Sequence, residues 1–478
     1  MSAQTLTLAD IIEALSGVRP AAAEQLALSG AVHDSREAKP DSLFVALHGE
    51  HVDGHDYAQA AFANGAAAAL VERPLDGIAA LDLRGGQQPA AGFAPVTPLC
   101  IVVDDGLLAL QQAARFWRRK LSDLRVVGIT GSVGKTTTKE LTADVLGQRY
   151  RTFKSAGNYN NEIGLPLSVL SITPDTERAV LEMGFYVIGE IALLADIAVP
   201  EIGVVTNIGT VHASRAGSQE AIYQGKAELV KNLSSEGVAI LNYDDPFVKR
   251  MAEETKARVF FYGLDPVADL WADEIEGLGL DGVRFRLHYQ GETLHVRIPL
   301  IGRHSVHTAL RAAAVGVIEG LDWGAIISGL RMGNAQLRLM AVPGRNGSLL
   351  LDDTYNASPE STVAALNLLS ELEGRKVAVL GDMLELGQYE EQGHRVVGNL
   401  AARVADVLVT VGPRAHTIAE TARVAGLQAS MVSEFENTET ALAYLKDALK
   451  AGDVVLVKGS RGVHMDKIVP DLEERNER

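Results

Sequence analysis

The chain has 478 residues, of which 47% are hydrophobic, and a formal net charge of −17. This length is too great for one hydrophobic core and predicts about three domains, while the acidic balance argues against nucleic acid as a partner. Cys100 is the only cysteine, so the chain can form no internal disulfide and no cysteine-based zinc site. The sequence has no leader-like pattern and no run of ~20 apolar residues, so we expect a cytoplasmic protein that is not integral to a membrane.

The first block of the chain ends in a long loop, which the glycines and prolines of residues 84–98 predict. A strand is expected at residues 99–103 and an amphipathic helix at residues 107–121. Short apolar runs then recur between helical patterns, at residues 179–183, 202–206 and 238–241. This alternation predicts a mostly parallel sheet.

Alternating apolar and polar residues on both sides of a turn predict an antiparallel hairpin from residues 283–289 and 294–298. Two helices are expected at residues 304–319 and 323–331. The last block again alternates strands with helices, and its strands are expected at residues 348–353, 376–380, 407–411 and 453–457. This block predicts a second, doubly wound α/β domain.

A glycine-rich turn joins an apolar strand to a helix within residues 126–138. Its residues are Gly131, Ser132, Val133, Gly134, Lys135, Thr136 and Thr137. Backbone N–H groups and the positive helix end of such a turn hold phosphates, its lysine reaches the outer phosphates, and its threonine hydroxyl binds Mg²⁺. The generic pattern has a glycine where this chain has Ile129, but a tight turn alone does not require a following Lys-Thr-Thr. The motif therefore predicts ATP as cosubstrate.

Polar side chains follow the predicted central strands, namely Glu182, Asn207, His212 and, on the next helix, Lys226. Each has an ordinary explanation when taken alone: a strand-end carboxylate, a loop residue or a solvated lysine. Together with Thr136 they form a set that suits Mg²⁺. In the last block Asp352 and Asp353 end one strand, and Lys458, Ser460 and Arg461 end another, where this domain would face the ATP site.

Over nearly its full length the chain resembles the Mur ligases, which use ATP to join an amino acid or dipeptide to a UDP-linked muramoyl acceptor. Residues 130–140 resemble their ATP loop, in which the early glycine is normally absent. Residues 32–37 and 43–55 resemble the UDP-binding segment of the two later-acting members. The Asp-Asn-Pro-Arg signature of the meso-diaminopimelate-adding member is absent.

Three narrower stretches resemble the member that adds D-alanyl-D-alanine to UDP-N-acetylmuramoyl-tripeptide: residues 157–166, 352–359 and 380–387 with His394. The resemblance implies an acyl phosphate of the tripeptide, which the dipeptide amine attacks to give UDP-N-acetylmuramoyl-pentapeptide, ADP and phosphate for peptidoglycan synthesis. It also implies three domains, which are a UDP-binding α/β domain (residues 1–105), a central ATP-binding domain with a P-loop (106–338) and a Rossmann-like domain (339–478). We expect a monomer.

The resemblance assigns roles to individual residues. The catalytic set is Lys135, Glu182, His212 and Lys226. Thr136 and Glu182 would hold one Mg²⁺, and His212 would hold a second with Lys226, which is carbamylated in the family. His304, Arg345 and Asp353 would contact the nucleotide beside the glycine-rich turn. The substrate-binding set is Ser35, Arg36, Asn160, Asn161, Asn356 and Lys458.

One stretch departs from the family, since Gly302-Arg-His-Ser-Val-His-Thr308 stands where the pattern is Gly-x-His-Asn-x-x-Asn. Ser305 and Thr308 replace asparagines that shape the adenine side of the site. A hydroxyl cannot reproduce the paired donor and acceptor of an amide, so altered nucleotide contacts are expected.

Two alternatives stay open. Folylpolyglutamate synthase and cyanophycin synthetase share the central domain, but they explain neither Asp34-Ser-Arg36 nor residues 381–387. A noncatalytic scaffold that binds UDP-sugar peptide would not need a complete two-metal ATP site. The sequence leaves the third tripeptide residue open between meso-diaminopimelate and L-lysine, and it does not identify the general base.

Overall fold

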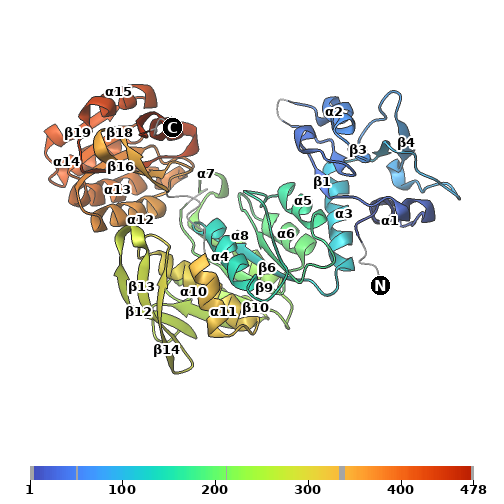
Figure 1. Cartoon of the computed structure of the whole chain (residues 1–478), viewed down its shortest axis with the longest axis horizontal. Coiled ribbons are helices and arrows are strands. Elements are labelled where there is room, and N and C mark those ends of the chain that lie inside the picture. The colour runs from blue at the N-terminus through green and yellow to red at the C-terminus, as the bar shows by residue number, and fades with distance from the viewer. Residues whose placement is uncertain (1–4, 50–51, 211–212, 333–339, 475–478) are drawn as a thin grey trace.

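The structure is a computed structural model that describes residues 5–49, 52–210, 213–332 and 340–474. Three β-sheets follow one another along the chain, each with its own helices, and the central sheet lies between the N-terminal and C-terminal parts (Figure 1). This is the α/β architecture predicted from the sequence. None of the helices in the described ranges has the length and apolar character needed to cross a bilayer.

The first sheet is fully parallel, with the order β1-β2-β3-β5-β4. Its strands are β1 (Ala31–Val32), β2 (Leu43–Val45), β3 (Ala68–Val71), β4 (Ala79–Asp82) and β5 (Leu99–Val102). Alternate side chains face opposite sides, so Phe44 and Cys100 pack towards α2 (Ala58–Ala63), while Leu43 and Ile101 pack towards α1 (Leu8–Ser16). The predicted loop after β4 contains only one short 3₁₀ turn, Arg84–Gly86.

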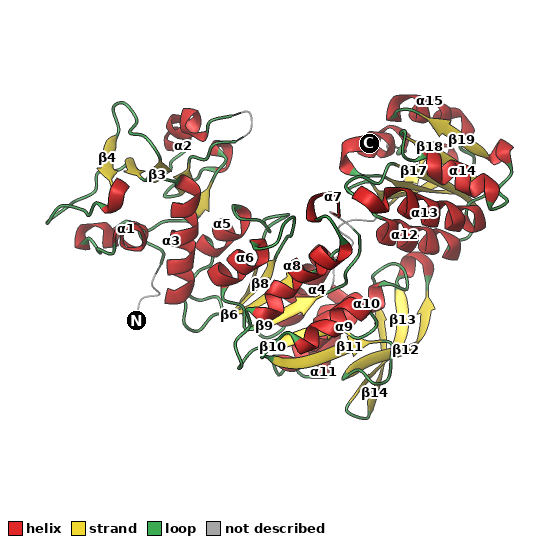
Figure 2. Cartoon of the chain, turned by 180° about the vertical axis from the view of Figure 1, so that it is seen from behind, coloured by secondary structure: helices red, strands yellow, loops and turns green. Residues whose placement is uncertain are grey.

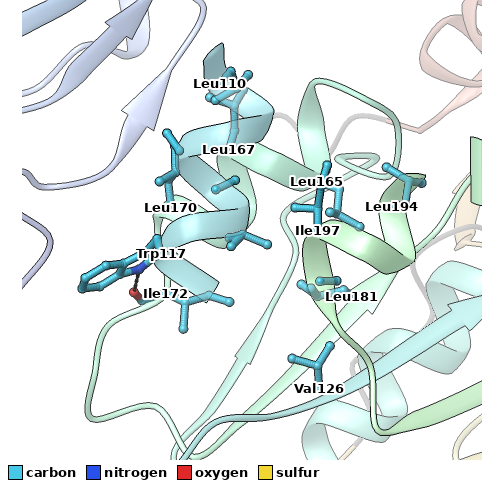
Figure 3. Close-up of a cluster of buried hydrophobic side chains, with 14 of the residues drawn as sticks. Leu110, Trp117, Val126, Leu165, Leu167, Leu170, Ile172, Leu181, Leu194 and Ile197 are labelled. Atoms are coloured by element: carbon cyan, nitrogen blue, oxygen red, sulfur yellow. Dashed lines mark hydrogen bonds between the residues drawn. The ribbon is translucent and has the colours of Figure 1, made fainter. Parts of the chain in front are cut away.

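Helix α3 (Gly106–Lys120) joins the first sheet to the second. It contacts α1 on one side and α5 (Gly164–Leu170) and α6 (Glu190–Ala198) on the other. Figure 3 shows Leu110 and Trp117 of α3 beside leucines of α5, with the Trp117 indole donating a hydrogen bond of 3.0 Å to the carbonyl oxygen of Ile172. The hydrophobic core is therefore continuous through α3, and the boundary at residue 105 remains a prediction.

The central sheet has nine strands in the order β14-β13-β12-β11-β10-β9-β6-β8-β7. They are β6 (Arg125–Thr130), β7 (Thr152–Lys154), β8 (Arg178–Glu182), β9 (Ile202–Val205), β10 (Val238–Asn242), β11 (Arg258–Gly263), β12 (Leu270–Gly277), β13 (Val283–Tyr289) and β14 (Glu292–Ile298). Pairing is parallel from β7 to β12 and antiparallel between β12, β13 and β14. The predicted strands β8, β9 and β10 and the hairpin β13–β14 are confirmed.

Helices cover both faces of this sheet. Helices α4 (Lys135–Leu146), α10 (Ser305–Ile318) and α11 (Trp323–Met332) pack on one face. Helices α5, α6 and α8 (Gln219–Lys231) pack on the other, and the short helices α7 (Ala213–Ala216) and α9 (Pro246–Arg250) lie in connections. Figure 2 shows the antiparallel part, β12–β14, extending from the sheet beneath α12 (Pro359–Glu371) and α13 (Glu390–Val404) of the C-terminal part.

The third sheet has the order β15-β16-β20-β17-β18-β19 and is parallel except for β15. Its strands are β15 (Met340–Gly344), β16 (Ser348–Asp353), β17 (Arg375–Gly381), β18 (Val407–Val411), β19 (Val432–Phe435) and β20 (Asp453–Lys458). Helices α12 (Pro359–Glu371), α13 (Glu390–Val404) and α14 (His416–Val424) pack on one face, and α15 (Thr438–Ala448) and α16 (Ile468–Leu472) on the other. This confirms the predicted doubly wound domain.

Candidate active site

The phosphate-binding turn occupies Gly131–Gly134, between the end of β6 and the start of α4. Both glycines have positive φ, 143° for Gly131 and 83° for Gly134, and a Cβ on Gly131 would overlap the hydroxyl of Thr206. Ile129, where the generic pattern has glycine, is a fully buried residue of β6. The turn thus begins only after the strand has ended, which explains why no glycine is needed there.

The turn is held in shape by the end of the neighbouring strand. Asn207 accepts hydrogen bonds of 2.9 Å from the backbone N–H groups of Ser132, at its carbonyl oxygen, and of Val133, at Oδ1. The Thr206 hydroxyl donates to the Val133 carbonyl oxygen at 2.7 Å. Asn207 therefore supports the phosphate loop, a role that sequence reasoning did not assign to it.

Three of the predicted site residues meet at one buried carboxylate. Glu182 ends β8 and is 2% exposed. Its Oε2 accepts a hydrogen bond of 2.9 Å from the Thr136 hydroxyl, and its Oε1 accepts one of 2.8 Å from the Asn160 amide. Thr136 and Glu182 are therefore adjacent, as their predicted role as joint Mg²⁺ ligands requires, and Asn160 brings a predicted substrate-binding segment to the same point.

Lys226 is not a solvated helix lysine, because it is 1% exposed on the inner face of α8. Its ammonium nitrogen lies 3.1 Å from the Gly131 carbonyl oxygen, which also accepts a hydrogen bond of 2.9 Å from Lys135. Burial, reinforced by the charge of Lys135 and opposed by Glu182, holds the pKa of Lys226 well below its usual value. Lys226 is therefore a candidate neutral amine beside the phosphate loop. His212, its predicted partner, lies outside the described residues.

A pocket with a cavity volume of about 190 Å³ lies between the central and C-terminal sheets. Predicted site residues in its wall are Ser132, Gly134, Thr137, His304, Asp353, Asn356 and Lys458, together with the divergent Ser305 and Thr308. Lys458 is 2% exposed and donates hydrogen bonds of 2.7 Å to Asp353 Oδ2 and 2.9 Å to the Asn356 carbonyl oxygen. The wall thus combines the phosphate loop with an ion pair of the C-terminal domain in which the lysine is buried.

His304 stands at the start of α10 in this pocket. The pKa of His304 is lowered to about 4, first because the surrounding pocket removes water from the ring and second because positive charges at His307, Arg311 and Lys458 lie nearby. Part of the residue's surface is nevertheless exposed. The ring is therefore neutral at neutral pH, and it offers a nucleotide an uncharged contact.

The C-terminal domain is docked on the central domain at the end of β9. Glu360 accepts a hydrogen bond of 3.0 Å from the Thr210 backbone N–H, and the Tyr389 hydroxyl accepts one of 3.2 Å from that of Gln219. The docked domain contributes Asp353 to the pocket wall, and the contact of Asp353 with the nucleotide stays a prediction.

The position of Arg345 differs from the prediction. Arg345 lies in the turn between β15 and β16 and is exposed, whereas Asp353 ends β16 at the pocket. The first and last residues of β16, Ser348 and Asp353, are five residues apart along the strand, which is roughly 16 Å at the rise of an extended chain. The sequence Pro-Gly-Arg could not reveal the distance between Arg345 and Asp353, because that distance is set by the pairing register of β15 with β16. The structure therefore does not bring Arg345 to the nucleotide pocket.

The predicted acceptor-binding residues come from two segments that contact each other. Tyr159, next to Asn160, donates a hydrogen bond of 3.3 Å to Glu37, so the segment of Ser35 and Arg36 lies against the Asn160 segment. Ser35 is buried, whereas Arg36 is exposed and pairs with Asp34 at 2.6 Å. Asn161 accepts the Gly164 N–H at 2.8 Å and so supports the start of α5.

Another pocket, of about 590 Å³, opens on the Thr136 side of the phosphate loop. Its wall contains Lys139, Asn158, Tyr355 and Arg461. Lys139 and Tyr355 were missed in the sequence, where they lie inside recognised motifs but carry no separate signal.

The fold and this site define a class of protein, and comparison with protein families agrees. The family models described as "Mur ligase family, catalytic domain", "Mur ligase middle domain" and "Mur ligase, glutamate ligase domain" match residues 28–90, 129–316 and 337–461. The chain belongs to the Mur ligase family.

Individual relatives narrow the comparison. The chain is 37% identical over 458 residues to the UDP-N-acetylmuramoyl-tripeptide--D-alanyl-D-alanine ligase of Bacillus subtilis, covering 94% of each chain. It is 36% identical to the Escherichia coli ligase of the same name, covering 98% of this chain and 99% of the other. The structure superimposes on MurF from Acinetobacter baumannii with a TM-score of 0.82 at 31% identity, covering 99% and 100% of the chains. For MurF ligase from Thermotoga maritima in complex with ADP the TM-score is 0.75 at 28% identity, covering 92% and 96%.

Proposed function

We propose that the chain is an ATP-dependent ligase that adds D-alanyl-D-alanine to UDP-N-acetylmuramoyl-tripeptide in peptidoglycan precursor synthesis. The observation that carries the proposal is the Thr136–Glu182–Asn160 contact, because it joins the phosphate loop, a buried carboxylate and the predicted acceptor segment. Full-length similarity to ligases of that name supports the choice of substrates. A cytoplasmic monomer is part of the proposal.

The donor set at Glu182 fits Mg²⁺. The carboxylate is almost fully buried, and the hydroxyl of Thr136 lies 2.9 Å from it, so two hard oxygen donors stand beside the phosphate loop. Thr136 and Glu182 would hold the ion, which when bound offsets negative charge on the phosphates of ATP. A second Mg²⁺ at His212 and Lys226 is part of the same proposal.

The proposed reaction begins with activation of the tripeptide. Its terminal carboxylate oxygen attacks the γ-phosphorus of ATP, the bond from that phosphorus to the β,γ-bridging oxygen breaks, and ADP leaves with the bonding electrons. Lys135, at the start of α4, holds its positive charge beside the transferred phosphoryl group. Asn160 donates a hydrogen bond to Glu182, which would orient the carboxylate and hold the predicted acceptor-binding segment beside the phosphate loop.

The second step forms the peptide bond. The free amine of D-alanyl-D-alanine attacks the acyl carbon, and the bond from that carbon to the phosphate oxygen breaks. Inorganic phosphate leaves with the bonding electrons and takes up the proton that the amine loses. Lys458 and Asp353 form one wall of the nucleotide pocket and would place the C-terminal domain against the reacting groups. Docking of this domain would exclude water from the acyl phosphate, which otherwise hydrolyses.

Lys226 fits a carbamate. A lysine must be neutral to react with CO₂, and burial lowers the pKa of Lys226 well below its usual value. The product is an anionic oxygen ligand, which suits a second Mg²⁺, and it would place a negative charge beside Lys135. Lys226 would then act as a metal ligand and not as a cation.

The alternatives make different predictions for one labelling experiment. Tripeptide substrate with both terminal carboxylate oxygens replaced by ¹⁸O is incubated with Mg²⁺-ATP and D-alanyl-D-alanine, and the released phosphate is analysed by mass. An acyl phosphate transfers one ¹⁸O to each phosphate released. A noncatalytic scaffold releases no phosphate, and unlabelled phosphate with no peptide product would refute the proposed reaction. An amide ligase with another substrate would not consume the tripeptide.

A further inference from the structure

Arg311 is a buried cation on α10 for which the described part of the chain provides no acidic partner. It is 4% exposed. Its Nη2 donates a hydrogen bond of 2.7 Å to the Thr308 hydroxyl, its Nη1 lies 3.4 Å from the Tyr262 hydroxyl, and its Nε has no hydrogen-bond partner. A buried guanidinium normally pairs with a carboxylate, so this arrangement requires an explanation.

The neighbouring groups do not supply the missing negative charge. Tyr262 is fully buried, which raises the pKa of its hydroxyl to about 12 and keeps it neutral. Asp244 pairs with His307 at 2.7 Å, and Asp245 accepts the backbone N–H groups at the start of α9. Neither forms an ion pair with Arg311 among the described residues.

Arg311 lies directly behind the phosphate loop. Its Nη2 is 3.2 Å from the position that a Cβ on Gly134 would take. Gly134 and Thr308 both form the wall of the nucleotide pocket, and Arg311 touches both from the protein side. The buried charge thus lies beside the phosphate loop, in surroundings where water screens it little.

We propose that Arg311 is a positioning residue for the nucleotide: its buried charge is neutralised by the polyphosphate of ATP across the phosphate loop, and its bond to Thr308 fixes the pocket wall. This inference rests on the proposed ATP-dependent function. It also accounts for the divergent residue at position 308, because a threonine hydroxyl is a good acceptor for a guanidinium whereas an amide directed to the nucleotide would compete for the same space. Arg311 does not contact the reacting atoms.

The test compares nucleotides that differ in charge. Dissociation constants of Mg²⁺-ATP, Mg²⁺-ADP and adenosine are measured by calorimetry for the parent, Arg311→Met and Arg311→Lys. Arg311→Met should bind ATP and ADP about 10-fold or more weakly, with adenosine affinity unchanged. Arg311→Lys keeps the charge and should retain most of the ATP affinity.

A matched control separates charge from packing. Arg118 on α3 is also buried, at 5% exposure, but it pairs with Glu201 at 3.0 Å, donates to the carbonyl oxygens of Ala198, Leu121 and Leu124, and is not part of the pocket wall. Arg118→Met should lower the melting temperature and leave the ratio of ATP to adenosine affinity unchanged. A parent-like ratio in Arg311→Met would overturn the inference, as would an Arg311→Lys variant that binds ATP as weakly as Arg311→Met. A parent that binds no ATP would overturn both this inference and the proposed function.

Discussion

The hydroxyl of Thr136 donates a hydrogen bond of 2.9 Å to Oε2 of Glu182, across the space between the first turn of α4 and the end of β8. The two residues are far apart in the sequence, and parallel pairing of β6 with β8 brings them together. The contact places a carboxylate at the phosphate loop. Without a cation between them, this carboxylate and the phosphates of ATP would repel each other. A cation shared by the carboxylate and the phosphates, as proposed above, would offset this repulsion.

Replacing Glu182 by glutamine should abolish most of the turnover. The amide keeps the size of the side chain but removes the negative charge that a divalent cation needs, so we expect kcat to fall on the order of 100-fold. Steady-state phosphate release at saturating Mg²⁺ and ATP measures this. The control is Glu201→Gln, since Glu201 accepts the backbone N–H of Val126 at the other end of the strands. Parent-like turnover in Glu182→Gln would contradict the proposed metal role.

Lys226 should carry a carbamate. Protein equilibrated with ¹³C-labelled CO₂ should show a carbamate carbon signal that is absent from Lys226→Met and present in Lys231→Met, which changes an exposed lysine on the same helix. Removing CO₂ should lower activity, and adding bicarbonate should restore it. Acidification should also reduce the signal, because protonation of the amine prevents its reaction with CO₂. A signal of equal strength in Lys226→Met would assign it to another amine.

The buried amine also predicts a pH dependence of stability in CO₂-free buffer. The pKa of Lys226 is below 10.5 in the folded state and near 10.5 in the unfolded state. Between these two values the unfolded chain binds the extra proton, so the free energy of unfolding rises with pH by up to about 1.4 kcal/mol per pH unit. Urea unfolding at several pH values should show this rise for the parent relative to Lys226→Met. A difference between the two proteins that does not change with pH would refute the lowered pKa.

Ser305→Asn should tighten ATP binding. The Ser305 hydroxyl donates to the Ile301 carbonyl oxygen at 2.8 Å, so it is bonded to the segment that precedes α10 and not directed to the pocket. An amide at this position can reach the nucleotide, and one added hydrogen bond corresponds to roughly 3- to 10-fold in affinity. Ser16→Asn is the matched control, because Ser16 makes the same bond to Ile12 in α1. Calorimetric constants equal to those of the parent would show that Ser305 does not weaken the site.

Apolar runs in the sequence predicted the middle strands of the central and C-terminal sheets, but strands of the first sheet and several edge strands were missed. Two of the missed strands have local causes. Strand β12 was missed because its alternation breaks at a bulge between Asp273 and Glu276, where Glu274 adopts a positive φ of 46°. Strand β15 was missed because it contains Pro343, which is tolerated only because β15 is an edge strand.

The site was predictable where one motif fixes the geometry. Lys135 and Thr136 follow the glycine turn directly, and Glu182 follows an apolar strand, so their neighbourhood could be inferred. The burial of Lys226 and the unpaired charge of Arg311 could not, because both depend on how helices pack against the sheet. The position of Arg345 could not be inferred either, since the hairpin register decides which end of β16 it occupies.

The central claim is best tested by phosphate release from Mg²⁺-ATP with UDP-N-acetylmuramoyl-tripeptide, with and without D-alanyl-D-alanine, and by the mass of the product. The tripeptide is supplied in both its meso-diaminopimelate and its L-lysine form. We predict release that requires both substrates and a product heavier than the tripeptide nucleotide by one dipeptide residue. Lys135→Ala should show neither. Absence of release with both tripeptides, or retained turnover in Lys135→Ala, would contradict the proposed ligase.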